Sequence, residues 1–154
     1  MATAVWSHVS VACVPDDTGP TTRDRYDAIV FDPDEHRGGF IRFQGLNTGD
    51  LFFWCNVVSP VDMPTWTAMW VTFRDANPDG FIEVRLYQKA MGDGATELKA
   101  TFTSSDVIGV VQREAQTYNH FGFDFANNTY FMRIQLHRSE TAGRLEFHSV
   151  SLCN

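Results

Sequence analysis

The chain has 154 residues, a length that suits a single domain over residues 1–154 with a sizeable core. Hydrophobic residues make up 44% of the chain and aromatic residues 14%, which argues against a disordered protein. The net charge of -7, with Lys and Arg residues that form no run, argues against a surface for nucleic acid. No window approaches an apolar membrane span, so we expect no membrane partner.

The first third of the chain is predicted to contain four short strands. Val5 to Val14 alternates apolar and polar residues, Tyr26 to Phe31 is a short apolar run, and Phe40 to Gln44 follows a pair of glycines. Leu51 to Val58 is apolar at nearly every position, which is typical of a strand buried on both faces.

The middle of the chain predicts a hairpin. Thr65 to Arg74 and Phe81 to Gln88 alternate, and the loop Asp75 to Gly80 between them has the proline and glycine of a tight turn. Leu98 to Thr103 is a weaker strand. Ser104 to Thr117 is the only segment with a helical tendency, and its β-branched residues argue against a stable helix.

The last two predicted strands have the clearest pattern. From Tyr130 to His137 every even position is apolar, and these residues alternate with Phe131, Arg133, Gln135 and His137. From Leu145 to Leu152 the apolar phase slips by one residue around His148, which predicts a β-bulge there. The whole pattern of about eight or nine strands predicts an all-β fold, an antiparallel two-sheet β-sandwich of jelly-roll type with its terminal strands side by side.

Three cysteines, Cys13, Cys55 and Cys153, allow at most one internal disulfide and leave one thiol over. We interpret Cys55, in a strand expected to be buried on both faces, as a small buried thiol. A bond between Cys13 and Cys153 is excluded if the terminal strands are antiparallel neighbours. The N-terminal segment lacks the pattern of a secretory signal, so the default compartment is cytoplasmic, with a mature secreted or surface domain as the alternative.

Three segments share the strand and turn chemistry of a known kind of module. They are PVDMPTWTAMWVTFRDANPDGFIEVRLYQK, the following ATFTSS, and the closing NNTYFMRIQLHRS with GRLEFHSVSL. On these features, the chain from Pro60 to Leu152 resembles β-sandwich modules that recur in bacterial surface, secreted and phage-tail-like proteins. The resemblance implies a β-sandwich fold and carries no catalytic residues with it.

The loop Asp75, Asn77, Asp79 and Gly80 matches the opening of a calcium site, in which alternating oxygens converge on one cation. The twelfth position, which requires a bidentate carboxylate, is Leu86. A turn of ordinary turn residues is therefore the main interpretation. We expect no cofactor, and calcium at this loop is the alternative that the sequence leaves open.

Two other groups of polar residues, three histidines and three acidic residues, could each form a functional site or serve only the structure. Histidines in the first and last two strands converge on a metal if these strands are neighbours, whereas single strand histidines are usually structural. Acidic residues before a turn match the carboxylate pair of glycoside hydrolysis, although a solvated acidic turn explains them equally well. The histidines are His8, His137 and His148, and the acidic residues are Asp32, Asp34 and Glu35.

A polar strand face with interleaved aromatic rings is the leading indication of function. Rings stack on sugar faces, and planar polar groups exchange hydrogen bonds with hydroxyls. Alternatively, the rings complete a second core layer or a subunit interface. The candidate ligand-binding residues are Trp6, Trp70, Tyr87, Arg85, Arg133, Gln135, His137 and His148.

We therefore predict a non-catalytic recognition or assembly module, with carbohydrate as the leading ligand class. One alternative is a small enzyme, a cyclase or isomerase, with a ring-lined cavity in which His137 or Arg133 steers a reactive intermediate. A further alternative is a structural subunit of a homo-oligomer. The direction of the rings separates the first two, because outward rings favour binding and rings around a closed cavity favour catalysis.

Overall fold

The computed structural model describes residues 6–9, 13–16, 26–32, 37–104, 108–117 and 122–153. These residues form eleven strands, more than the eight or nine predicted, and among them is no helix that is long and apolar enough to cross a membrane. The strands are β1 (Trp6–Val9), β2 (Val14–Pro15), β3 (Tyr26–Asp32), β4 (Arg37–Phe43), β5 (Gly49–Val57), β6 (Ala68–Asp75), β7 (Gly80–Ala90), β8 (Thr96–Thr103), β9 (Ile108–Thr117), β10 (Asn128–Arg138) and β11 (Leu145–Cys153).

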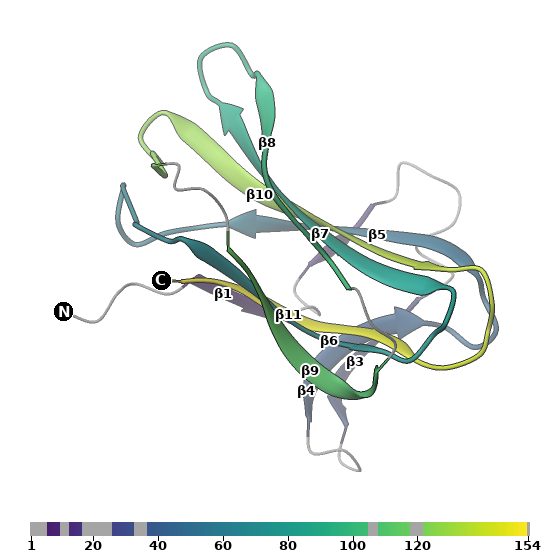
Figure 1. Ribbon diagram of the computed structural model, residues 1–154. Helices are drawn as coiled ribbons and strands as arrows, with labels where there is room; N and C mark the ends of the chain where they lie inside the picture. The colour runs from purple at the N-terminus through teal and green to yellow at the C-terminus, as the bar shows by residue number, and fades with distance from the viewer. Residues whose placement is uncertain are drawn as a thin grey trace.

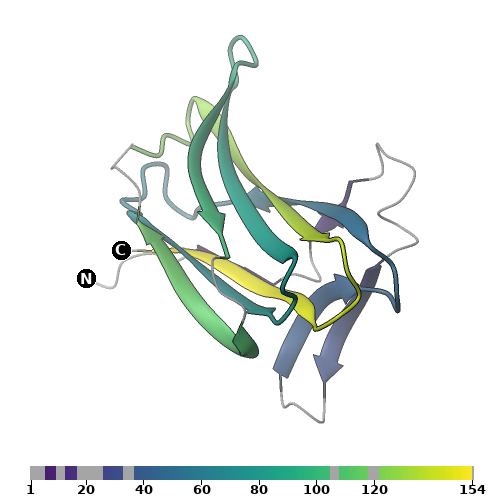
Figure 2. The same ribbon diagram turned by 45° about the vertical axis from the view of Figure 1, so that its right-hand side comes forward.

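The strands form two antiparallel sheets that lie as two layers (Figures 1 and 2). Sheet A has the order β3-β4-β11-β6-β9, with β1 also paired to β11. Sheet B has the order β2-β5-β10-β7-β8. The predicted all-β, two-sheet antiparallel sandwich is confirmed. The terminal strands β1 and β11 pair antiparallel, as expected.

Alternate residues of both sheets enter one hydrophobic core. In β10 the even-numbered residues from Tyr130 to Leu136 are buried, as the alternation predicted. In β11 the pairing with β6 shifts between Phe147 and Ser149, which confirms the predicted bulge. The bulge lets Phe147 and Val150, which are an odd number of residues apart, both reach the core. Each such apolar side chain contributes about 1.5–3 kcal/mol when fully buried.

The predicted hairpin of the two strands around Asp75 to Gly80 is wrong. β6 pairs with β11 and β9 in sheet A, whereas β7 pairs with β10 and β8 in sheet B. The loop therefore carries the chain from one layer to the other, and β6 and β7 face each other across the core. Proline and glycine suit an inter-sheet corner as well as a hairpin, so turn chemistry alone did not separate the two.

Two other segments contain a strand that was not predicted. The segment with the helical tendency contains β9, which lies at the edge of sheet A beside β6. Its β-branched residues are compatible with a strand, and pairing with β6 supplies the backbone hydrogen bonds. The predicted first strand from Val5 to Val14 is divided, because β1 belongs to sheet A and β2 to sheet B.

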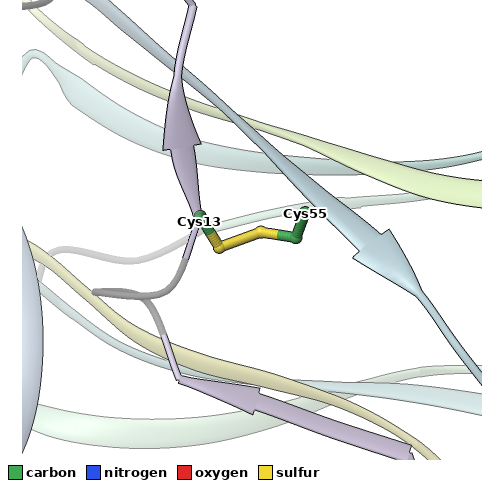
Figure 3. The surroundings of a disulfide bond; sticks show 2 residues. All are labelled: Cys13 and Cys55. Atoms are coloured by element: carbon green, nitrogen blue, oxygen red, sulfur yellow. A yellow bond between two sulfur atoms is a disulfide. The ribbon is translucent and has the colours of Figure 1, made fainter.

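The interpretation of Cys55 as a thiol is wrong, because Cys55 forms a disulfide with Cys13 (Figure 3). The pairing of β2 with β5 places Val14 opposite Trp54, and so brings the preceding Cys13 beside Cys55. Both cysteines are buried. Cys153 is the free cysteine among the described residues. The disulfide thus fastens the N-terminal segment to β5.

The loop between β10 and β11 is fastened to the β6–β7 corner. Asn77, fully buried, donates from Nδ2 to the backbone oxygens of Glu140 (2.8 Å) and Ala142 (2.6 Å). Gly143 has a φ of 75°, and a Cβ there would lie 1.9 Å from the backbone oxygen of Ala76. This position therefore requires glycine, both for its backbone conformation and for the close approach.

Candidate ligand-binding face

The outer side of sheet B carries a band of aromatic and polar side chains, which we call the sheet B face. In β5, β10 and β7 every second residue enters the core, and most of the residues between them are half-buried on the opposite side. The side chains of this face are Asp50, Phe52, Trp54, Phe81, Glu83, Arg85, Tyr87, Phe131, Arg133, Gln135 and His137.

Three rings of the sheet B face form a row across neighbouring strands. Phe131 of β10 lies directly opposite Tyr87 of β7, and their rings stack with centroids 5.3 Å apart and planes at 17°. Trp54 of β5 lies 5.5 Å from Phe131 on the other side, tilted by 58°. The row is a continuous apolar surface across three strands, with ring edges and faces partly open to solvent.

Arg133 lies beside this row and is held by aromatic rings. Its guanidinium carbon is 4.1 Å from the centroid of Phe52 and 5.8 Å from that of Trp54. Cation–π contacts of this kind orient the planar guanidinium on the rings. Arg133 therefore presents hydrogen-bond donors next to an apolar surface.

A polar network occupies the end of the sheet B face at the start of β5. Gln135 Nε2 donates to Asp50 Oδ1 at 2.7 Å, and His137 Nδ1 lies 2.9 Å from the same oxygen. The His137 ring also stacks on Phe81, with centroids 5.0 Å apart. His137 and Asp50 keep 32% and 40% of their side chains exposed, so the network is open to a ligand.

Glu83, Arg85 and Tyr87 line the β7 side of the face. Arg85 Nε lies 2.7 Å from Glu83 Oε1. The hydrogen bond to Tyr87 and the contact with Glu83 raise the pKa of the Arg85 guanidinium above its usual value. Arg85 therefore stays charged, and its position is set by neighbours on the same strand.

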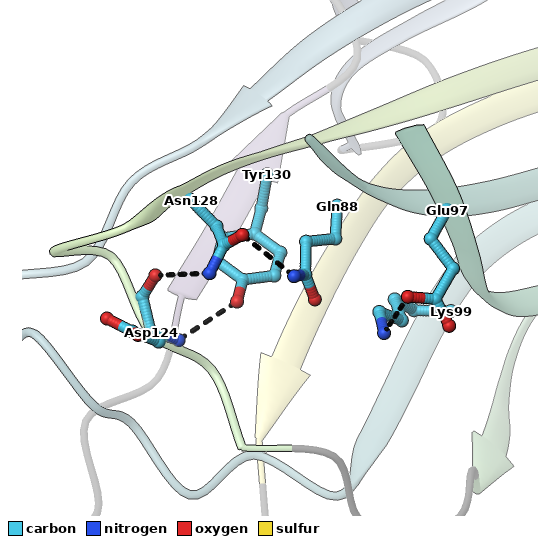
Figure 4. Close-up of polar contacts among 6 residues, drawn as sticks. All are labelled: Gln88, Glu97, Lys99, Asp124, Asn128 and Tyr130. Carbon is cyan, nitrogen blue, oxygen red and sulfur yellow. Dashed lines mark hydrogen bonds and ion pairs between the residues drawn. The ribbon is translucent and has the colours of Figure 1, made fainter. Parts of the chain in front are cut away.

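Hydrogen bonds hold β7 to β10 at the other end of the face (Figure 4). Gln88 Nε2 donates to Asn128 Oδ1 at 2.8 Å, and Asn128 Nδ2 donates to the backbone oxygen of Asp124. The Asp124 backbone N–H donates to the Tyr130 hydroxyl at 2.9 Å. Burial raises the pKa of Tyr130, so this hydroxyl stays neutral. The bonds fix the ends of both strands that carry the stacked pair Phe131 and Tyr87.

The structure brings together five of the eight residues predicted from the sequence to bind a ligand. Arg85, Tyr87, Arg133, Gln135 and His137 lie on the sheet B face. The other three belong to sheet A. They are Trp70 in β6, next to the guanidinium of Arg113; His148 in β11; and Trp6 in β1, whose side chain is outside the described residues.

Phe52, Trp54 and Phe131 were not among the predicted ligand-binding residues. Leu51 to Val58 was interpreted as buried on both faces, which is wrong, because Phe52 and Trp54 are half-buried on the outer side of β5. The pairing with Tyr87 in β7 gives Phe131 its place in the row. The sequence could have identified Phe131, because the alternation of β10 places it on the same side of the strand as Arg133 and His137.

The side chains of Asp75 and Asn77, two residues of the proposed calcium loop, are engaged by the protein itself. The buried Asp75 carboxylate accepts a hydrogen bond of 2.6 Å from Ser104. Asn77 uses its amide on the β10–β11 loop, and its Oδ1 accepts from the backbone N–H of Asp79 at 3.0 Å. No group of three or more His, Cys, Asp or Glu side chains that could hold a metal occurs in the described part of the chain.

Asp75 is expected to make stability depend on pH. Burial raises its pKa, and the hydrogen bonds from Ser104 and Asn77 offset this only in part. The folded protein binds the Asp75 proton more tightly than the unfolded chain does. Protonated Asp75 therefore adds to the free energy of unfolding at low pH, and this stabilisation is lost as the pH rises through the raised pKa. In urea unfolding at a series of pH values, the free energy of unfolding should fall less with rising pH for Asp75→Asn than for the unmodified protein. Parallel pH profiles would contradict this assignment.

The three histidines do not share a sheet. His137 lies in sheet B, whereas β1 and β11 carry His8 and His148 in sheet A, with the His8 side chain outside the described residues. His148 Nε2 lies 3.4 Å from Glu146 Oε2, and its ring lies 5.0 Å from Phe40. The acidic cluster of the sequence also falls outside the described residues, at positions 34 and 35 and at the side chain of residue 32.

Glu146 is fully buried in sheet A. Burial alone would raise its pKa, but the contact with His148 and the charges of Arg74 and Arg144 outweigh burial and lower the pKa overall. Glu146 is therefore ionised and holds neighbouring cations in place.

No protein-family model matches this sequence, and no curated protein matches it either. Among solved structures, the chain is similar to the CBM36-1 domain of a multidomain xylanase from the hindgut metagenome of Trinervitermes trinervoides. The TM-score is 0.53, with 9% identity and coverage of 97% of each chain. It is also similar to the family 11 carbohydrate-binding module of Clostridium thermocellum, in complex with a β-1,3-1,4-mixed-linked tetrasaccharide. Here the TM-score is 0.50, with 9% identity over 100% of this chain and 98% of that one. These likenesses show the β-sandwich fold.

Proposed function

We propose that the protein is a non-catalytic carbohydrate-binding module and that the sheet B face binds the glycan. The observation that carries the proposal is the row of Trp54, Phe131 and Tyr87 across three strands, with Arg133 and Gln135 beside it. The rings offer flat apolar surfaces to the faces of successive sugars. The guanidinium and amide offer donors and acceptors to their hydroxyls.

The fold supports the proposal. The family 11 module was solved with a tetrasaccharide, so a sandwich of this architecture can present a surface to a short glycan. A tetrasaccharide contains several sugars, and a surface that extends over β5, β10 and β7 can contact more than one of them. The resemblance to bacterial surface and phage-tail-like modules stays a prediction.

The direction of the rings favours binding over the enzyme alternative. Tyr87 and Trp70 are half-buried on outer sheet faces and do not belong to the buried core. A cyclase or isomerase with a ring-lined interior needs these rings on the inner side. The homo-oligomer alternative stays a prediction.

We also propose that the protein works in an oxidising compartment, outside the cytoplasm. The Cys13–Cys55 disulfide supports this, because such bonds persist mainly in secreted, periplasmic and surface proteins. This favours the secreted or surface alternative over the cytoplasmic default.

Replacing Trp54 tests the glycan site. Trp54→Ala removes one end of the ring row and a neighbour of Arg133, so we expect glycan affinity to fall roughly 30-fold, equivalent to about 2 kcal/mol. A glycan array would identify the ligand, and calorimetry would measure the affinity of both proteins.

The matched control is Trp70→Ala, because Trp70 is half-buried on the outer side of the other sheet. This variant should bind the glycan as the unmodified protein does. Equal losses in both variants, or an array on which the unmodified protein binds no glycan, would refute the proposal.

A further inference from the structure

A pocket at one end of the sandwich shares no residue with the sheet B face. It has a volume of about 280 Å³ and lies at the loops that join β4 to β5 and β10 to β11. Arg42, Arg138 and Arg144 are among the residues that line it, and none of its lining residues is acidic. A concentration of three arginines at one small pocket contrasts with the net charge of -7 of the whole chain.

Arg138 is the central group of this pocket. It is only 5% exposed, and Nε and Nη2 donate to the backbone oxygens of Asn47 (2.6 Å) and Gly45 (2.7 Å). Its guanidinium also lies 4.6 Å from the Phe43 ring centroid. These partners are all uncharged, and no carboxylate of the described residues forms an ion pair with Arg138.

A buried cation without a counter-ion is unfavourable. Burial lowers the pKa of Arg138, but an arginine remains charged in proteins. Nη1 donates to no acceptor among the described residues, so it can donate to a ligand. An anion in the pocket would neutralise the guanidinium and accept these donors.

The other two arginines add positive charge at the rim. Arg42 Nε lies 3.8 Å from Asp27 Oδ2, and Arg144 Nη1 lies 3.8 Å from Glu146 Oε1, both beyond a direct hydrogen bond. The side chains are 38% and 52% exposed. Both arginines line the pocket, and the nearby carboxylates hold their guanidiniums beside it.

The loop that carries Arg144 is held in one position before any ligand arrives. The two hydrogen bonds from Asn77 fix the backbone at Glu140 and Ala142, and Gly143 packs against Ala76. A preorganised wall reduces the entropy that binding must overcome. This gives a role in a binding site to an asparagine that the sequence suggested only for calcium.

We propose that this pocket binds a small oxyanion, a carboxylate, sulfate or phosphate group on a ligand no larger than a monosaccharide. Arg138 forms the base of the site, and Arg42 and Arg144 close it from the rim. The planar forks of arginine match the oxygen pairs of such groups. The site is independent of glycan binding on the sheet B face.

Calorimetric titration of the full chain with sodium phosphate, sodium sulfate, glucuronate and uncharged glucose tests the proposal. At least one oxyanion should bind, and glucose should not. Added sodium chloride should weaken the binding by screening. Binding of glucuronate but not phosphate would identify an acidic sugar as the ligand type, and the reverse result would identify an inorganic anion or phosphate ester.

Two partly exposed arginines provide variants that should still fold. Arg144→Gln and Arg42→Gln are each expected to weaken oxyanion binding about tenfold, the loss of one charge-assisted hydrogen bond. Arg113→Gln removes the same charge from exposed β9 and should leave binding unchanged, as should Trp54→Ala. The proposal is overturned if no oxyanion binds better than glucose, or if Arg113→Gln weakens binding as much as Arg144→Gln.

Discussion

Replacing Cys13 and Cys55 together with alanine is expected to lower the free energy of unfolding by about 4 kcal/mol, because the bond closes a long loop of the unfolded chain. The two cysteines are 42 positions apart in the sequence. Without the bond, the unfolded chain gains conformational entropy while the folded state gains nothing. A domain whose total stability is about 5–15 kcal/mol loses a large part of it. Urea unfolding followed by tryptophan fluorescence measures the difference.

The third cysteine provides the control for this experiment. Cys153 is free and partly exposed at the end of β11, so Cys153→Ala should change the stability by less than about 0.5 kcal/mol. The double variant should also bind glycan more weakly, since β2 pairs with β5 beside Trp54. If the double variant were as stable as Cys153→Ala, the disulfide would contribute nothing to the fold.

Asn77→Ala is expected to destabilise the protein by about 3 kcal/mol, the sum of three hydrogen bonds at roughly 1 kcal/mol each. The amide donates to the backbone oxygens of Glu140 and Ala142, which fastens the corner of β6 and β7 to the β10–β11 loop. Its oxygen accepts from the backbone N–H of Asp79 within the corner itself. Alanine leaves the acceptor oxygens without their donors. Equilibrium unfolding in urea measures the loss.

Asn56→Ala is the matched control, because Asn56 is exposed near the end of β5. The same substitution there should shift stability by less than about 0.5 kcal/mol. Because Asn77 holds the wall of the arginine pocket, Asn77→Ala should also weaken oxyanion binding at temperatures where it remains folded. Equal stability of the two variants would show that the asparagine is not a structural link between the sheets.

The strands themselves were largely predictable, because alternation is a local property of the chain. The even-numbered residues of β10 are buried as expected, and the slip of phase around His148 corresponds to an observed bulge. Alternation failed where both phases are apolar. In β5 it did not distinguish a strand buried on both sides from one that presents Phe52 and Trp54 to solvent.

The candidate site was predictable only in part, for a related reason. Residues with the same phase share a face of their own strand, but phase does not say which sheet the strand joins. Trp70 and Tyr87 have the same outward orientation and lie on opposite layers. Five predicted residues converge because β7 and β10 are neighbours, and Trp54 joins them because β5 pairs with the other side of β10.

The sequence by itself determined the all-β class, the alternation of the major strands and the bulge in β11, because these follow from neighbouring residues. The tertiary structure alone decided which strands pair, and with them the layer change after β6, the Cys13–Cys55 bond, the row of three rings and the arginine pocket. Each of these joins residues far apart in the chain. Their contacts depend on the register of strands packed around a shared core, which no local pattern encodes.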